Sequence, residues 1–397
     1  MNKRDINNID SSRQLCGETI FIVLMIIGMF SRQLKVTSVS GVESYFTALL
    51  LVALGFAIFE IIRKKYSRRE LYIIAGILLF FCIIYIINGR QNEYLLINII
   101  AIITVKSIEP SRFVKLLRNT YAILFFMLFV FLKMGLIENT SVSKGTSSGI
   151  WITCIAYGFH HSNTFYWMFY ILVSSYVYCR FYRLKTIEII IIISVSFYFY
   201  TTTFSRAGLF CIVMLLLFRW LLLKVNILKV KIIKLLCTYL YACLFLLSLV
   251  FSLVSNNNNN KNSLIMQINY WTTGRFTIAA NYLQAYKLNF FGRDVTKTLP
   301  FDNMYMFVIL SFGLVTAIIL IILYTKLCRY LMDENLYAEL CITIIFAVYS
   351  IFESQYTNVF YNYSIIFFGY LIYTNTKWKS TLPNVVNKFK ENKLWKR

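Results

Sequence analysis

The stretch NMYMFVILSFGLVTAIILIIL, Asn303–Leu323, contains no charged side chain in 21 residues. A helix of this length is about as long as the hydrocarbon core of a bilayer is thick. In a soluble protein such a helix would have to be covered on every side. The stretch therefore predicts a helix that crosses a membrane.

The composition of the whole chain favours the same interpretation. Of its 397 residues, 59% are hydrophobic and 14% are charged, whereas about a quarter of the residues of a soluble domain are charged. We therefore expect residues 1–397 to form a single integral membrane domain of the all-α class.

Twelve segments are apolar enough to be spans of a polytopic transmembrane helical bundle. In chain order they are Glu18–Leu34, Tyr45–Ile62, Leu71–Asn88, Tyr94–Val105, Tyr121–Ile137, Thr164–Cys179, Ile187–Thr203, Ala207–Leu223, Leu235–Val254, Asn303–Leu323, Ala338–Phe352 and Tyr363–Thr374. The fourth and the twelfth are short, so counts of ten and eleven spans stay open.

The basic residues predict the orientation of the bundle, because cytoplasmic loops carry the excess of Lys and Arg. With the N-terminus in the cytoplasm, 28 of the 40 basic residues lie in inner segments and 10 in outer ones. This asymmetry predicts an even number of spans, two cytoplasmic termini and a basic cytoplasmic tail at residues 375–397. It also accounts for most of the net charge of +23, so no nucleic-acid partner is expected.

Two of the outer connections are long, namely Glu138–Asn163 and residues 255–300. Loops of more than about 15 residues are uncommon unless they are functional or disordered. Both loops are therefore expected on the functional, extracytoplasmic face, with the Asn256–Asn260 run as a flexible part. The nine Cys contain no CxxC and there are only two His, so neither a metal nor another cofactor is expected.

The second long loop contains an amphipathic pattern. Its apolar side chains recur at helical spacing at Phe276, Ala279, Ala280, Leu283 and Tyr286. This pattern predicts a helix along the membrane surface, capped by either of the two threonines at positions 272 and 273. The first turn of that helix would hold Arg275, where the helix dipole disfavours a cation unless an anion binds there too. The alternative is an interfacial Arg275 that contacts lipid headgroups.

Other polar residues of the outer face have both functional and structural interpretations. Arg206 lies in the short turn between the seventh and eighth spans, where it could bind an anion or reach to the interface. His161 and Asn163 precede the sixth span, where a His can titrate and where Ser162 and Asn163 could instead cap and pack. Arg293 could bind substrate or pair locally with Asp294.

Two outer carboxylates, Asp302 and Glu353, lie at span ends, where burial could raise the pKa toward that of a useful base. Arginines combined with a few carboxylates suit the stabilisation of a phosphate or pyrophosphate leaving group. Because the outer face has no evident nucleotide supply, the donor would have to arrive activated, as on a lipid pyrophosphate.

Five short motifs follow one another in the outer loops: FHHSN at 159–163, SRAG at 205–208, TGR at 273–275, FGRD at 291–294 and DNMY at 302–305. In this order they resemble the motifs of the Wzy-type O-antigen and capsular polysaccharide polymerases, which belong with the O-antigen ligases. The resemblance covers roughly Gly158 to Gly313. Three positions depart from the pattern: Ser162 stands for a Pro, Asp294 for a Gly, and Asp302 where a His is frequent. The last departure leaves any His-dependent step at that position in doubt.

The resemblance implies a metal-independent glycosyltransferase in the bacterial cytoplasmic (inner) membrane. Such an enzyme joins undecaprenyl-pyrophosphate-linked oligosaccharide repeat units into O-antigen or capsule chains. Its partners would be these lipid-linked oligosaccharides and the bilayer, with a chain-length regulator and a flippase as further implied partners. The expected catalytic residues are Arg206, Arg275, Asp302 and Glu353, and the expected substrate-binding residues are His161, Asn163 and Arg293.

Two alternatives remain open. An O-antigen ligase would differ in its acceptor rather than in its chemistry. A polysaccharide flippase would also have about twelve spans, but it predicts charges lining the middle of the membrane, where the expected spans hold few.

Overall fold

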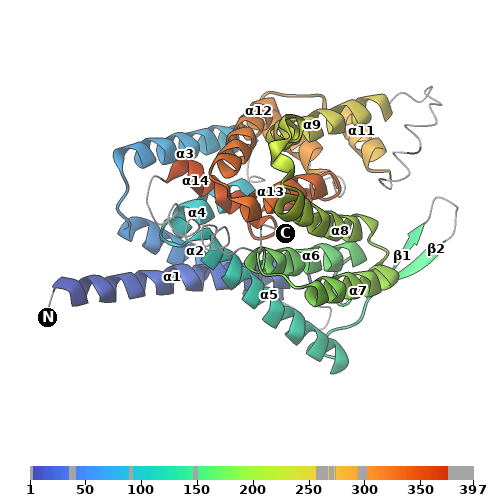
Figure 1. The fold of residues 1–397 in the computed structure, drawn as a ribbon, viewed down its shortest axis with the longest axis horizontal. Helices are drawn as coiled ribbons and strands as arrows, with labels where there is room; N and C mark the ends of the chain where they lie inside the picture. Colours follow the sequence, from blue (N-terminus) through green and yellow to red (C-terminus); the bar gives the residue numbers. More distant parts are fainter. Residues whose placement is uncertain are drawn as a thin grey trace.

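The structure is a computed structural model that describes residues 3–34, 42–88, 93–145, 151–255, 267, 272, 274–293 and 302–373. These residues form a helical bundle with one pair of strands (Figure 1). The helices are α1 (Lys3–Ser31), α2 (Val42–Arg63), α3 (Arg68–Asn88), α4 (Glu93–Thr104), α5 (Pro110–Lys133), α6 (Ser162–Cys179), α7 (Thr186–Thr203), α8 (Arg206–Trp220), α9 (Lys231–Ser255), α11 (Arg275–Tyr286), α12 (Met304–Asp333), α13 (Tyr337–Tyr349) and α14 (Gly369–Ile372). The strands are β1 (Ser141–Gly145) and β2 (Trp151–Ile155).

The apolar character of the helices indicates a membrane protein. Among the described residues, α3, α5, α7, α8 with its extension to Val225, α9 and α12 are the six helices long and apolar enough to cross a bilayer. The apolar windows of α3 and α7 are each only 17% buried within the protein, against 56% for α12. The apolar faces of α3 and α7 thus point away from the protein, as expected for helices in contact with lipid.

Each of the twelve expected segments overlaps described helix, which confirms the all-α prediction. Four of the overlapping apolar helices are shorter than the six candidate spans: Gly17–Ser31, Leu95–Ser107, Tyr337–Tyr349 and Tyr363–Ile372. The last consists of a 3₁₀ helix, Tyr363–Phe368, followed by the four residues of α14. The basic segment 375–397 and the Asn256–Asn260 run lie outside the described residues.

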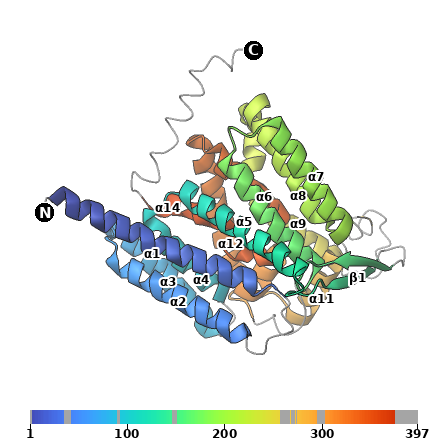
Figure 2. The ribbon, with the colours of Figure 1, turned by 90° about the horizontal axis from the view of Figure 1, so that it is seen from below.

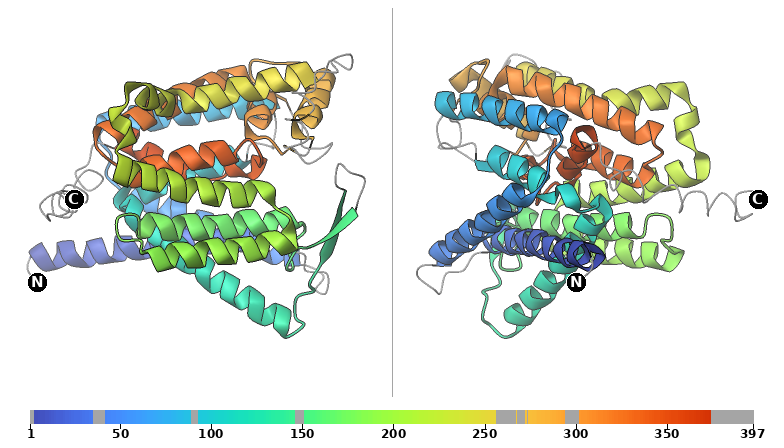
Figure 3. Two further views of the ribbon diagram at one scale, coloured as in Figure 1. Left: turned by 45° about the vertical axis from the view of Figure 1, so that its right-hand side comes forward. Right: turned by 90° about the vertical axis from the view of Figure 1, so that its left-hand side faces the viewer.

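The elements meet at two ends of the bundle. The strand pair and α11 lie together at one end, and α1 begins at the other (Figures 1 and 3). We call the first the hairpin end and the second the opposite end. Because consecutive helices run back and forth, α6 and α12 begin at the hairpin end, and α7 and α13 finish there. Residues far apart in sequence are therefore neighbours at the hairpin end.

The helix α6 forms the centre of the part of the bundle built from α5 to α8 (Figure 2). Most of its side chains are buried, and it packs against α5, α7, α8 and α13. Its Trp167 and Tyr170 meet aromatic rings of the C-terminal segment edge to face, with Trp167 and Tyr361 ring centroids 4.7 Å apart. Such edge contacts are favourable between aromatic rings. The packing of α6 against four neighbouring helices thus positions its first residues at the hairpin end.

The hairpin was not predicted, because the Glu138–Asn163 connection was expected to be a loop. Its strands pair antiparallel with Ser141 opposite Ile155 and Lys144 opposite Ile152. The pairing extends beyond the strands, since the Ala156 N–H donates to the Thr140 carbonyl at 2.8 Å. The hairpin therefore connects α5 to α6 as an ordered element, and it carries a lysine to the hairpin end.

The FG pair of the fourth motif is explained by backbone packing. Gly292 and Gly313 have φ of +80° and +84°, and the Leu314 N–H donates to the Asn289 carbonyl at 3.0 Å. A Cβ on Gly313 would lie 2.3 Å from the Phe290 carbonyl oxygen. Both positions need glycine, because other residues disfavour positive φ and neither has space for a side chain. The contact breaks the helical geometry of α12 at Gly313.

Candidate active site

Arg275 is the first residue of α11, which confirms the predicted helix and its register. The residue before the helix is Gly274, with φ of +78°, so the expected threonine cap is wrong. The expected place of the helix also needs correction. Its apolar face was expected to lie on the membrane surface, but it packs onto α9, where the ring centroids of Phe276 and Phe251 are 5.3 Å apart. Protein therefore covers this face instead of lipid.

The Arg275 side chain is buried between two carboxyl groups. Its Nη2 lies 3.4 Å from Glu353 Oε1, and its Nε lies 3.7 Å from Asp302 Oδ2. The Arg275 side chain is 7% exposed, that of Glu353 9%, and that of Asp302 40%. Asp302 is thus the carboxylate of this group that meets the solvent.

The antiparallel pairing of α12 and α13 brings the two carboxyl groups together. Asp302 comes just before α12 begins and Glu353 follows the end of α13. The Met304 N–H donates to the Ser350 carbonyl at 2.9 Å and joins the two ends. Asn303 caps α12, its Oδ1 accepting from the Met306 N–H at 3.1 Å, as a short polar side chain does at this position. The helix cap accounts for the Asn that follows Asp302.

The pKa of Glu353 is raised to about 8, mainly by burial and also by the neighbouring Asp302, although Arg275 and Lys144 oppose the shift. A carboxyl with a pKa near 8 is mostly protonated at neutral pH. The Arg275 charge is then opposed mainly by Asp302, and the group keeps an excess of positive charge.

A lysine that was not among the expected site residues completes the group. Lys144 of β1 donates from Nζ to Asn163 Oδ1 at 2.7 Å and to the Thr203 carbonyl at 3.0 Å. The pKa of Lys144 is lowered to about 8, mainly by burial and also by Arg275 and Arg206, although Cys154 and Glu353 oppose the shift. Lys144 thus connects the hairpin to the start of α6 and to the end of α7.

One sequence signal could have found Lys144. It is the only Lys or Arg in the Glu138–Asn163 connection, and a lone lysine in a long loop expected on the outer face is a candidate anion ligand. The helical periodicity used for the spans carries no information about a hairpin, so the placement of Lys144 could not be predicted.

His161 and Asn163 form the N-terminus of α6. His161 is itself the helix cap, because its Nδ1 accepts from the Asn163 N–H at 3.1 Å. Burial, together with the charges of Lys144 and Arg275, lowers the pKa of His161 to about 4. His161 is therefore neutral near pH 7, with its proton on Nε2, where it can donate a hydrogen bond.

Arg206 begins α8 directly after the turn that follows Thr203. Its side chain is exposed, and its charge acts on Lys144. Together with Lys144 and Arg275 it gives the hairpin end three cations against two carboxyl groups. A net positive, partly buried group of this kind is suited to bind an anion.

Six of the seven expected site residues thus belong to one group, and Arg293 does not. The Arg293 N–H donates to the Leu310 carbonyl at 2.8 Å, and its side chain is exposed. In the described structure it makes no hydrogen bond or ion pair with the group. Its expected local partner, Asp294, lies outside the described residues.

The chemistry available to the group is acid–base and electrostatic. Among the described residues no three His, Cys, Asp or Glu side chains are arranged to hold a metal ion. Arginine and lysine can stabilise a phosphate oxyanion by charge-assisted hydrogen bonds, and a solvent-accessible carboxylate can accept a proton. Comparisons of the chain with protein-family models, curated proteins and solved structures find no match.

Proposed function

We propose that the protein is a polysaccharide polymerase of the cytoplasmic membrane of a bacterium. It joins undecaprenyl-pyrophosphate-linked oligosaccharide repeat units into O-antigen or capsule chains. In this proposal the chain crosses the membrane twelve times with both termini in the cytoplasm, and the hairpin end faces outward. The sequence resemblance described above motivates the substrate, and the cation group motivates the chemistry.

The observation that carries the proposal is the grouping of Arg275, Lys144 and Arg206 beside Asp302 and Glu353 at one end of an apolar helical bundle. Segments separated by more than 100 residues supply this group. A pyrophosphate leaving group needs cations placed around its oxygens, and a hydroxyl nucleophile needs a nearby proton acceptor. The group offers both.

The proposed transfer runs as a single displacement. A hydroxyl oxygen of the acceptor unit forms a bond to the anomeric carbon of the growing chain. The bond from that carbon to the pyrophosphate oxygen breaks, and its electron pair leaves with the lipid pyrophosphate. Arg275, Lys144 and Arg206 stabilise the departing negative charge. The hydroxyl proton passes to Asp302, which is the more accessible carboxylate, while Glu353 holds Arg275 in place.

The test is the lipid-linked and surface glycan profile of a strain that lacks the gene, complemented with variants. Wild type should restore long chains, and Arg275→Ala should leave single repeat units on the lipid carrier. Lys287→Ala is the matched control, because Lys287 directly follows α11 with an exposed side chain. It should restore long chains. Immunoblots of membranes establish that all three proteins are present in equal amounts.

Other glycan profiles would assign the protein differently. Repeat units retained on the cytoplasmic leaflet in the deletion strain would indicate a flippase. Long chains that stay on the lipid carrier would indicate a ligase. Long chains of wild-type length with Arg275→Ala would refute the proposed role of Arg275.

A further inference from the structure

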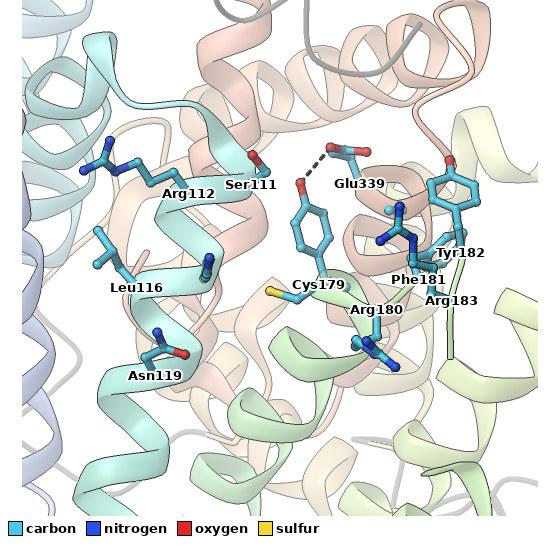
Figure 4. A pocket seen from close by; sticks show the side chains of 13 residues that line it. Ser111, Arg112, Leu116, Asn119, Cys179, Arg180, Phe181, Tyr182, Arg183 and Glu339 are labelled. Atoms are coloured by element: carbon cyan, nitrogen blue, oxygen red, sulfur yellow. Dashed lines mark hydrogen bonds between the residues drawn. The ribbon is translucent and has the colours of Figure 1, made fainter. Parts of the chain in front are cut away.

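A second candidate binding site is a pocket of 720 Å³ at the opposite end of the bundle. The first turns of α5, the end of α6, the α6–α7 connection and the start of α13 form its walls (Figure 4). It is distinct from the candidate active site. The two lie at the two ends of α6, whose 18 residues correspond to a separation of about 27 Å.

The rim of the pocket is basic. Four cations line it, Arg112 and Lys115 from α5 and Arg180 and Arg183 from the α6–α7 connection. Only Arg180 has an acidic partner in the described structure, Glu188 at 3.2 Å. The nearby Glu109 is engaged by the Ser111 hydroxyl instead, at 3.4 Å. The rim therefore carries uncompensated positive charge on two walls that face each other.

The inner wall of the pocket carries a carboxyl and a tyrosine hydroxyl in place of cations. Glu339 of α13 is buried, and its Oε1 accepts a hydrogen bond from the Tyr178 hydroxyl at 2.7 Å (Figure 4). The Tyr178 hydroxyl is thus already engaged by Glu339, so an anionic ligand would remain at the rim, among the four cations. The pocket is thus suited to a headgroup held near the surface rather than to a ligand enclosed in the protein.

An apolar surface begins where the basic rim ends. Ile187, Ile190 and Ile191 of α7 are 58%, 53% and 54% exposed, and they follow Arg183 by one to two helical turns. A phosphate at the rim could therefore be attached to a chain that lies along α7. Basic pockets between membrane helices are known to hold anionic headgroups in this way.

We propose that this pocket binds a phosphate-bearing anion, and that the phosphate belongs to the headgroup of an anionic lipid. Arg112 and Lys115 contact the phosphate from one wall, and Arg183 contacts it from the other. The acyl chains lie against the exposed isoleucines of α7. This inference does not depend on the reaction proposed for the hairpin end.

The experiment is native mass spectrometry of the full-length protein in a neutral detergent, titrated with phosphatidylglycerol and, separately, with phosphatidylcholine. The double variant Arg112→Ala/Lys115→Ala should lose affinity for phosphatidylglycerol by at least about fivefold, because each surface cation contributes roughly a tenfold or smaller factor. Binding of phosphatidylcholine should not change. Both substituted side chains are exposed, and an unchanged melting temperature verifies that the variant folds.

The matched control is Lys224→Ala/Lys229→Ala, which removes two exposed cations outside the pocket, beyond the end of α8. It should bind phosphatidylglycerol like wild type. Equal phosphatidylglycerol affinity in the pocket variant, or equal losses in both variants, would overturn the proposal. Equilibrium dialysis with inorganic phosphate distinguishes the source: binding of free phosphate that depends on Arg112 and Lys115, without lipid binding, would overturn the assignment to a lipid.

Discussion

Arg275 lies between two carboxyl groups that differ in their exposure to solvent. Glu353 is buried and has a raised pKa, whereas Asp302 reaches the solvent. A guanidinium between them is held in a fixed direction while part of its charge stays uncompensated. That is the condition under which an arginine is both ordered and able to attract an anion.

The raised pKa of Glu353 should make the stability of the protein depend on pH. Its pKa rises from 4.5 to about 8 on folding, so folding favours the protonated form. Its contribution to stability is full below about pH 4.5 and is lost as the pH rises through 8. Between pH 6.5 and 8.5 the melting temperature of wild type should fall by at least about 2 °C relative to Glu353→Gln.

Differential scanning fluorimetry of both proteins in the same detergent measures this difference. The chosen window lies above the titration of His161, so that this residue is neutral throughout. Lys144 has a pKa of about 8 and titrates within the window in both proteins, so the difference between wild type and Glu353→Gln, rather than either melting curve alone, reports on Glu353. A constant difference between the two proteins across the window would contradict a raised pKa for Glu353.

Substitution of Lys144 should lower the activity while the protein still folds. Lys144→Met removes two hydrogen bonds made by a charged donor, to Asn163 and to the Thr203 carbonyl. Hydrogen bonds of charged groups are worth about 1.5–3 kcal/mol, which corresponds to about 10–150-fold if the loss falls on the transferring state. The rate of polymer formation in membrane vesicles should fall by such a factor, and Lys144→Arg should recover part of it.

At the level of elements, two features outside the regular helices bring distant segments together. They are the hairpin and the contact between Gly292 and Gly313. The hairpin carries Lys144 to α6. The Gly292–Gly313 contact joins the segment that follows α11 to the middle of α12, and the Asn88 side chain of α3 donates to the Phe291 and Ser311 carbonyls beside it. The FG motif thus has a structural role, although it occurs among the motifs that contain expected site residues.

The glycine contact predicts a large effect of a small substitution. Gly313→Ala places a Cβ 2.3 Å from a carbonyl oxygen at a φ of +84°, and should lower the free energy of unfolding by about 1–3 kcal/mol. Gly76→Ala is the control, because a Cβ at Gly76 of α3 meets no atom within 4 Å. It should be neutral or stabilising by up to about 1 kcal/mol.

Thermal melts of the two glycine variants give the comparison. In a chain of 397 residues, a loss of about 1 kcal/mol lowers the melting temperature by roughly 1 °C. If Gly313→Ala melts at the same temperature as wild type, the close backbone contact does not contribute to stability in the expected way.

For the whole molecule, the proposed topology places the two ends of the bundle on opposite faces of the membrane. Lys287→Cys at the hairpin end should react with a membrane-impermeant maleimide in intact spheroplasts. Lys229→Cys at the opposite end should react only after the membrane is opened. Both side chains are exposed, so accessibility depends on the membrane alone.

Labelling of the native protein is the baseline, because the chain contains nine cysteines of its own. Labelling of Lys229→Cys in intact spheroplasts, with Lys287→Cys protected, would reverse the proposed orientation. It would also place the candidate active site in the cytoplasm.

The positions of the helices and six residues of the site group could be predicted from the chain itself. Apolar runs of about 20 residues specify helices, because every backbone polar group in a bilayer must be paired within its own segment. The motif residues were recognisable because they lie in the connections that are expected on the outer face, where charged side chains are otherwise scarce. Arg275 in the first turn of a helix followed from the spacing of five apolar residues.

The partners of these residues depend on contacts that are distant in sequence. Lys144 meets Asn163 through a hairpin, Glu353 meets Arg275 across 78 residues, and α11 packs on α9 rather than on lipid. Local periodicity describes one element at a time and contains no information on which side chain lies opposite another. The pKa of Glu353, the role of Gly292 and the basic pocket all arise from such long-range packing, because burial and the nearest charges exist only once the helices are assembled.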